Sequence, residues 1–95
     1  MHIFITGGTR GIGFGLVTEF LKTGNSVTFT GTSEKSVQKA LNSFSGSFLG
    51  IVCDVREKKQ IEKAKDLALK KFGNIDIWVN NAGVDQERLD VSDLS

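Results

Sequence analysis

The sequence predicts an α/β fold in which a parallel β-sheet lies between two layers of helices. Short apolar segments alternate with longer segments of helical periodicity, in the order β-α-β-α-β-α-β. The short segments are apolar on both sides, which is typical of strands that helices cover on both faces. Glycines cluster directly after the first of them. We therefore expect a single three-layer α/β/α domain over residues 1–95, a partial doubly wound fold with strand order 3-2-1-4.

The first half of the chain contains two predicted strands and two predicted helices. Residues 2–6 form a compact apolar strand, and residues 26–30 are rich in β-branched and aromatic side chains. Between them, apolar residues recur at helical spacing from Gly11 onward, and Gly24 stands where a helix commonly ends. Ser33 is a good N-cap for the second helix. The apolar stripe of that helix consists of Val37, Ala40, Leu41 and Phe44.

The second half of the chain continues the alternation. Residues 48–52 and 75–79 are predicted strands, and residues 57–72 form the clearest helix, closed by Gly73. One face of this helix is lysine-rich, but acidic residues are interspersed, which indicates a solvated surface rather than a site for an acidic partner. Residues 85–95 are polar and carry no full apolar stripe.

Composition argues against several classes of partner. Twelve Lys and Arg against eleven Asp and Glu give a formal charge of +1, so we expect no nucleic-acid or anionic-membrane partner. The single cysteine, Cys53, cannot form an internal disulfide or a multi-thiolate metal site. No apolar run approaches the ~20 residues that span a bilayer. The first strand begins next to Met1 and leaves no room for a leader peptide, so we expect a cytoplasmic protein.

Three residues outside the motifs have ordinary interpretations. His2, at the start of a strand, is expected at the surface rather than in a set of ligands. Cys53 is expected to be a buried small apolar residue rather than a reactive thiol. Trp78 lies in an apolar strand segment, which favours a place in the core or at an interface over stacking on a cofactor.

The strongest chemical signal lies between the first strand and the first helix, where residues 6–13 read T-G-G-T-R-G-I-G. Glycines at such a turn let a pyrophosphate approach the backbone, and the helix N-terminus offers it unpaired N–H groups. The spacing differs from the G-x-G-x-x-G dinucleotide fingerprint, and no Lys-Ser or Lys-Thr follows as in a P-loop. From spacing alone, two interpretations stay open: cofactor binding, or a turn that only permits tight packing of strand and helix.

Two further motifs follow at corresponding strand ends: Cys53-Asp54-Val55 after the third strand, and N-N-A-G at residues 80–83 after the fourth. Together with T-G-x-x-x-G-x-G, they resemble the short-chain dehydrogenase/reductase family over essentially the whole chain to Gly83. Residues 30–34 are also similar to the end of the second strand in NADPH-dependent 3-oxoacyl-acyl-carrier-protein reductases. The resemblance implies a Rossmann-like fold and an oxidoreductase that transfers hydride between a nicotinamide cofactor and a carbonyl or an alcohol.

The resemblance also assigns cofactor-binding roles to particular residues. Asp54 would accept a hydrogen bond from the adenine amino group, with Val55 against the ring; alternatively, Asp54 caps the next helix. Asn81 and Ala82 would lie beside the ribose near the middle of the cofactor, whereas Asn80 either contributes there or only holds the sheet together. The residues around the pyrophosphate and the adenosine ribose would be Gly7, Gly8, Thr9, Arg10, Gly11, Ile12 and Gly13.

The end of the second strand favours NADP over NAD. A carboxylate at this place selects the ribose hydroxyls of NAD, whereas a cation selects the 2′-phosphate of NADP. Here Thr32 and Ser33 offer hydroxyls, while Arg10 among the glycines and Lys35 in the next helix offer positive charge. Glu34 is the alternative, because it can turn towards a ribose diol; its other role is that of an acid in the first turn of a helix.

The catalytic groups implied by the resemblance are a tyrosine acid/base, a lysine four positions later and a serine, all from later segments. This sequence has no tyrosine, and we assign no catalytic role to Ser92 or Ser95. We therefore expect the chain to be the cofactor-binding N-terminal part of such a reductase, which binds dinucleotide without turnover. Two other hypotheses are a stand-alone module that senses NADP(H) and a truncated gene product that serves as an oligomerisation unit.

The fourth predicted strand also bears on assembly. In a complete doubly wound sheet it is an interior strand, but here its outer edge has no successor. The strand would leave backbone groups and apolar side chains open to water, those of Ile75, Ile77, Trp78 and Val79. It also lacks the prolines and edge lysines that discourage pairing. We therefore expect a homo-oligomer joined through the edge of this strand.

Overall fold

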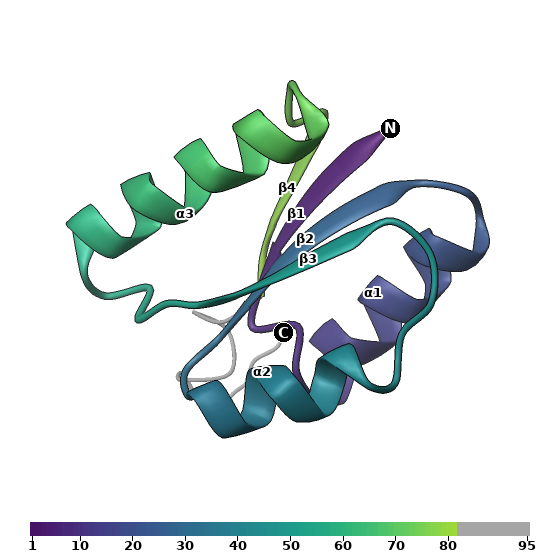
Figure 1. Ribbon diagram of the computed structural model, residues 1–95, viewed down its shortest axis with the longest axis horizontal. Helices are drawn as coiled ribbons and strands as arrows, with labels where there is room; N and C mark the ends of the chain where they lie inside the picture. The colour runs from purple at the N-terminus through teal and green to yellow at the C-terminus, as the bar shows by residue number, and fades with distance from the viewer. Residues whose placement is uncertain (82–95) are drawn as a thin grey trace.

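A computed structural model describes residues 1–81 and confirms the predicted α/β architecture. In chain order its elements are β1 (His2–Thr6), α1 (Gly11–Lys22), β2 (Ser26–Gly31), α2 (Glu34–Leu41), β3 (Phe48–Val52), α3 (Lys58–Phe72) and β4 (Ile77–Asn80). The strands in this part of the chain are parallel and lie in the predicted order, β3-β2-β1-β4. Helices α1 and α2 cover one face of the sheet and α3 covers the other, which gives the three layers (Figure 1).

The sheet separates two apolar cores, because successive side chains of a strand point to opposite faces. On the side of α1 and α2, Ile3 and Ile5 of β1 pack with Val17 and Phe29. On the side of α3, the buried cluster consists of Phe4, Cys53, Ala64 and Ala68. Every residue of β1 is buried, as expected of a strand that has a neighbour on each side and helices on both faces.

The interpretation of Cys53 as a buried apolar residue is confirmed. Its side chain is 1% exposed, and burial raises the pKa of the thiol, with a smaller contribution from the charge of Asp54. Within residues 1–81, no three metal-binding side chains come together. No helix in the same range is long and apolar enough to cross a membrane.

β4 begins at Ile77, two residues later than the sequence predicts, because the side chain of Asp76 takes the place of a strand partner. Its carboxylate accepts the backbone N–H of His2 at 2.7 Å, and the N–H of Asp76 donates to the His2 carbonyl at 2.8 Å. Regular pairing of β1 with β4 therefore starts one residue further on, with Ile3 opposite Ile77.

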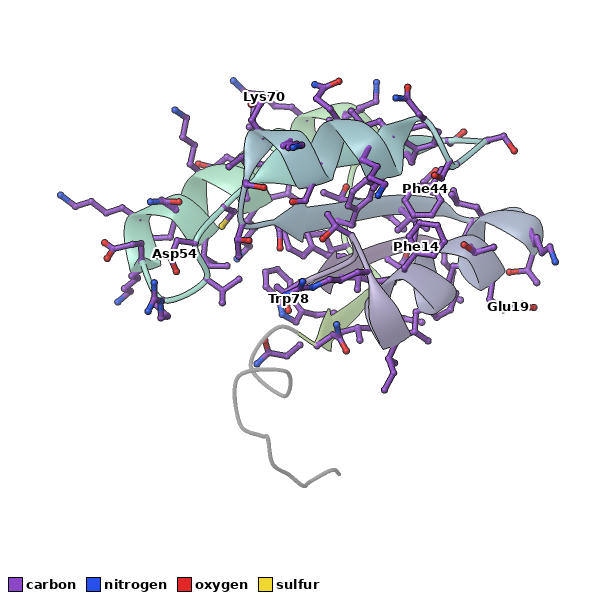
Figure 2. All side chains as sticks on the ribbon, turned by 90° about the horizontal axis from the view of Figure 1, so that it is seen from below. Phe14, Glu19, Phe44, Asp54, Lys70 and Trp78 are labelled. Atoms are coloured by element: carbon purple, nitrogen blue, oxygen red, sulfur yellow. The ribbon has the colours of Figure 1, made fainter. Side chains whose placement is uncertain are left out.

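α2 ends at Leu41, so Phe44 of the predicted stripe lies beyond the helix. Its ring still packs into the same core, with its centroid 4.8 Å from that of Phe14 and 5.2 Å from that of Phe29. Figure 2 shows Phe14 and Phe44 next to each other. The apolar pattern thus predicts correctly that Phe44 packs against this core, where it is partly buried, but it overestimates the length of the helix.

Trp78 lies at the edge of the described sheet, because within residues 1–81 β4 pairs with β1 alone. One face of its ring stacks on Phe4, with centroids 4.2 Å apart and planes inclined by 4°. The residue nevertheless remains 40% exposed. Association of two chains through this edge stays a prediction.

The expectation that His2 lies at the surface is wrong, since the residue is 3% exposed. Its Nε2 lies 2.8 Å from the hydroxyl of Thr28, and its Nδ1 lies 3.2 Å from the carbonyl of Gly73. Because a carbonyl only accepts, Nδ1 must donate to Gly73, and in the neutral tautomer that does so Nε2 accepts from the Thr28 hydroxyl. The ring also meets Phe72 edge-on, so His2 joins the start of β1 to β2 and to the end of α3.

We expect the bond between His2 and Thr28 to stabilise the fold measurably. His2→Phe keeps an aromatic ring but leaves the buried Thr28 hydroxyl without its partner, which should lower the free energy of unfolding by about 1–3 kcal/mol. Thr28→Val should have a similar cost, because it leaves Nε2 of His2 unpaired. The double variant should lose less than the sum of the two in urea unfolding. Additive losses would contradict the coupling.

Candidate functional site

The carboxyl ends of the parallel strands meet at one edge of the sheet, and the predicted site residues follow these ends. The turn after β1 carries the glycine loop, residues 7–13. Thr32 follows β2, Asp54 and Val55 follow β3, and Asn81 follows β4. Four motifs that are far apart in the sequence are therefore brought to the same edge, as the resemblance implies.

Hydrogen bonds from both sides of β1 hold the glycine loop. On one side, the N–H of Gly7 donates to the hydroxyl of Thr30 at 3.1 Å, and the N–H of Gly8 donates to the Thr30 carbonyl at 2.9 Å. On the other side, Nδ2 of Asn81 donates to the Gly7 carbonyl at 3.0 Å. Gly7 and Gly11 have φ of 74° and 61°, in the left-handed region that favours glycine. The loop is thus hydrogen-bonded to β2 on one side and to the residue after β4 on the other.

Gly8 and Gly13 serve close packing, and neither has a left-handed φ. A Cβ at Gly13 would overlap the carbonyl oxygen of Gly7 and would lie 2.6 Å from Nδ2 of Asn81. A Cβ at Gly8 would lie 2.6 Å from Cβ of Phe29. Close packing therefore requires glycine at these two positions, while their assignment to the cofactor stays a prediction.

The first turn of α1 offers an electropositive backbone at this edge. Arg10 is the N-cap residue, its side chain makes no capping hydrogen bond, and no acidic residue lies in the first turn. The helix dipole is therefore not compensated within that turn, which favours an anion there. Beside it, Ile12 is 71% exposed although its side chain is apolar.

A cavity of about 460 Å³ opens between α1 and α2 next to the glycine loop. We call it the α1–α2 cavity. Among the lining side chains that residues 1–81 contribute, two, Arg10 and Lys39, are cations and none is acidic. Its other lining residues are Thr9, Phe14, Thr32, Ser33, Ser36, Ala40 and Ser43. The cavity therefore combines positive charge with hydroxyl groups, a composition that suits an anionic ligand.

Of the two lysines on α2, one lines the cavity. Lys35 does not line it, whereas Lys39, which we did not predict, does. The sequence contains a signal that would have identified this face of α2. The lining residues Ser36, Lys39, Ala40 and Ser43 recur at intervals of three and four, which places them on one side of a helix. Glu34 is also absent from the lining, and its carboxylate accepts a hydrogen bond from Nε2 of Gln38 at 3.1 Å.

The prediction that Ser33 caps α2 is confirmed. Its hydroxyl oxygen accepts the backbone N–H of Ser36 at 3.1 Å and donates its proton to the Ser36 hydroxyl oxygen at 3.0 Å. Ser36 in turn donates to the Ser33 carbonyl at 3.1 Å. Both hydroxyl protons are therefore used within the cap.

The Asp54 carboxylate accepts hydrogen bonds from Arg56 and does not cap α3, whose N-cap residue is Glu57. Its Oδ1 accepts from the backbone N–H of Arg56 at 3.0 Å and from Nε at 3.1 Å, while its Oδ2 accepts from Nη2 at 3.0 Å. The side-chain bonds with Arg56 lower the pKa of the Asp54 carboxyl, and the backbone bond lowers it further. The neighbouring Val55 packs against the core beneath α3.

The asparagines of the fourth motif contact β1. Asn81 is 7% exposed and reaches the glycine loop through its bond to Gly7. Asn80 accepts a hydrogen bond from the hydroxyl of Thr6 at 3.3 Å, which joins the ends of β4 and β1. This contact supports the sheet-holding interpretation of Asn80. The predicted site residue Ala82 lies outside the described residues.

The strand order and the glycine loop at the carboxyl end of the first strand place this chain in the class of Rossmann-like parallel α/β domains. The profile of the short chain dehydrogenase family matches residues 1–95. The chain therefore belongs to this family, whose members are NAD(P)-dependent oxidoreductases.

Relatives of known name are similar to the chain over most of its length. It is 44% identical over 87 residues to the chloroplastic chlorophyll(ide) b reductase NOL of Oryza sativa subsp. japonica, covering 86% of this chain and 25% of that protein. It is 40% identical over 86 residues to the 3-oxoacyl-acyl-carrier-protein reductase FabG of Haemophilus influenzae, covering 90% and 35% of the two. The chain thus spans about a quarter to a third of these relatives.

Solved structures are also similar to this chain in fold. A short chain dehydrogenase from Bacillus anthracis has a TM-score of 0.78 and 37% identity, covering 84% of this chain and 34% of that one. The 3-ketoacyl-(acyl-carrier-protein) reductase from Brucella melitensis, complexed with NADH, has a TM-score of 0.76 and 26% identity, covering 81% and 32%.

Gly13→Ala should destabilise the chain although it adds a single methyl group to a helix. The new Cβ would overlap the Gly7 carbonyl oxygen, and relieving this overlap should cost about 2–3 kcal/mol of unfolding free energy. Gly15→Ala is the matched control, because a Cβ there meets nothing within 4 Å. The control should gain about 0.5–1 kcal/mol from helix propensity. Urea unfolding followed by Trp78 fluorescence measures both; equal responses would refute the packing constraint.

Arg56→Gln should raise the pKa of the Asp54 carboxyl towards its ordinary value, because it removes the guanidinium bonds, the largest cause of the lowered pKa, and keeps only the backbone bond. A carboxyl with a lowered pKa in the folded state adds stability above its unfolded pKa, and this stability is lost as pH falls through the folded pKa. The pH at which the chain unfolds on acidification should therefore be higher in the variant than in the wild type. Titration of the Asp54 carboxyl carbon by NMR measures the change, and an unchanged pKa would contradict it.

Proposed function

We propose that the chain binds NADP(H) as the nucleotide-binding part of a short-chain oxidoreductase. The observation that carries the proposal is the α1–α2 cavity, to which the described residues contribute the cations Arg10 and Lys39 and no acidic side chain. NADP differs from NAD by a 2′-phosphate, and an anion of this kind is bound by cations and hydroxyl donors rather than by a carboxylate.

The glycine loop supports the pyrophosphate part of the proposal. The uncapped first turn of α1 lies directly beside the α1–α2 cavity, since Arg10 belongs to both. A ligand with a diphosphate and a separate phosphate therefore matches two neighbouring electropositive features. The Brucella melitensis neighbour is complexed with NADH, which supports a nicotinamide dinucleotide in general. The preference for the 2′-phosphate rests on the cavity of this chain.

In this proposal the residues of the chain bind and orient, and the dinucleotide supplies or accepts the hydride. Arg10 and Thr32 would contact the 2′-phosphate, and Asp54 and Val55 would contact the adenine. The remaining contacts would come from the glycine loop and from Asn81 and Ala82. We assign no catalytic residue in this chain, and turnover of a ketone or alcohol by the 95-residue chain is not expected. The cytoplasmic location stays a prediction.

Calorimetric titration should show NADPH bound more tightly than NADH. Arg10→Gln should weaken NADPH binding by about 1.5–3 kcal/mol, the range for a charge-assisted hydrogen bond, and should leave NADH binding nearly unchanged. Lys70→Gln, on α3 at the opposite face of the sheet, is the control for losing one positive charge. Equal wild-type affinity for the two cofactors would refute the NADP preference. If Arg10→Gln weakened the binding of both cofactors equally, Arg10 would not be the residue that contacts the 2′-phosphate.

A further inference from the structure

We propose that Lys39 determines specificity for the 2′-phosphate, together with Arg10, as two cations that face one anion from α2 and α1. The inference rests on the proposed function, because it names a residue of the same cofactor site. Neither the glycine loop nor the end of β2 contains Lys39, which lies in the last turn of α2. The juxtaposition that carries the proposal is the presence of Arg10 and Lys39 in the lining of one cavity.

Helix geometry selects Lys39 among the lysines of α2. Ser36, Lys39 and Ser43 line the α1–α2 cavity and share a face of the helical segment through their spacing of three and four. Lys35 lies on the same helix and carries the same charge, yet it is not part of the lining. The two lysines therefore differ in position: Lys39 lines the cavity and Lys35 does not, although they carry the same charge.

No carboxylate neutralises either cation in the described part of the chain. The ion pair found within residues 1–81 joins Arg56 to Asp54, and it involves neither Arg10 nor Lys39. The acid nearest in sequence on α2, Glu34, bonds to Gln38 instead. Two unpaired cations around one cavity attract a group with more than one negative charge, which a phosphate monoester provides near neutral pH.

The serines of the cavity already use their hydroxyl protons, so binding of a phosphate depends more on the Lys39 ammonium group. The hydroxyl protons of Ser33 and Ser36 are used within the cap of α2, and the Ser43 hydroxyl donates to the Lys39 carbonyl at 3.4 Å. An incoming phosphate would have to break these bonds to gain donors from the serines. Within residues 1–81 the Arg10 guanidinium and the Lys39 ammonium make no hydrogen bond or ion pair that a phosphate would have to break, so they provide donors without that cost.

Adenosine 2′,5′-bisphosphate and adenosine 5′-monophosphate test the proposal on the 95-residue chain, because they differ only in the 2′-phosphate. Lys39→Gln should weaken the bisphosphate about 10-fold in calorimetry and should change the monophosphate by less than about twofold. Lys35→Gln, the matched control, should leave both ligands within about twofold of wild type. Lys39→Arg should restore most of the bisphosphate affinity, since it keeps the charge.

The outcomes separate this inference from the proposed function. A wild-type chain that prefers the bisphosphate but does not respond to Lys39→Gln would overturn the role of Lys39 alone. Equal losses in Lys39→Gln and Lys35→Gln would also overturn it, because they would reflect net charge. A wild-type chain that binds the two nucleotides equally, or binds neither, would overturn the NADP proposal and the inference with it. Urea unfolding of each variant identifies any loss that comes from a damaged fold.

Discussion

The close approach of the first turn of α1 to the Gly7 carbonyl is the contact on which the rest of this edge depends. No side chain fits at Gly13, because a Cβ there would overlap that oxygen. The same oxygen accepts the side-chain N–H of Asn81, so α1, β1 and the end of β4 meet at one atom. Moving α1 outward would separate Arg10 from the sheet and open the α1–α2 cavity. The electropositive site therefore exists because a glycine lets a helix lie against a turn.

The opposite wall of the cavity depends on glycines in the strands in the same way. A Cβ at Gly31 would lie 2.5 Å from Cγ2 of Thr9 and 2.8 Å from Cγ2 of Val37. A Cβ at Gly50 would lie 3.0 Å from Cδ2 of Leu41. α2 thus lies against β2 and β3 at positions where the strands lack side chains. The spacing between the two helices, and with it the width of the cavity, follows from these contacts rather than from the helices themselves.

Sequence patterns predict the features that depend on neighbouring residues. Strand and helix order, the Ser33 cap and the glycine turn each follow from a local spacing, and all three are found in the structure. Features set by contacts across the fold were missed. The burial of His2 requires the end of α3 to lie over β1, which no local pattern encodes. The choice of Lys39 over Lys35 likewise depends on which face of α2 turns towards α1, and the charge pattern alone does not contain it.

The bond between Asn81 and Gly7 joins residues that are 74 positions apart in the chain. Pairing of β1 with β2 closes a much shorter segment, since His2 lies opposite Ser26, whereas β1 meets β4 only after three helices and two strands have been traversed. Closing the longer loop costs more chain entropy, and contacts of high sequence separation form slowly. During folding, β4 is thus expected to dock after the β1–β2 pair. The contact between Asn81 and the glycine loop requires β4, so it is expected to form after the loop has gained its bonds to Thr30 of β2.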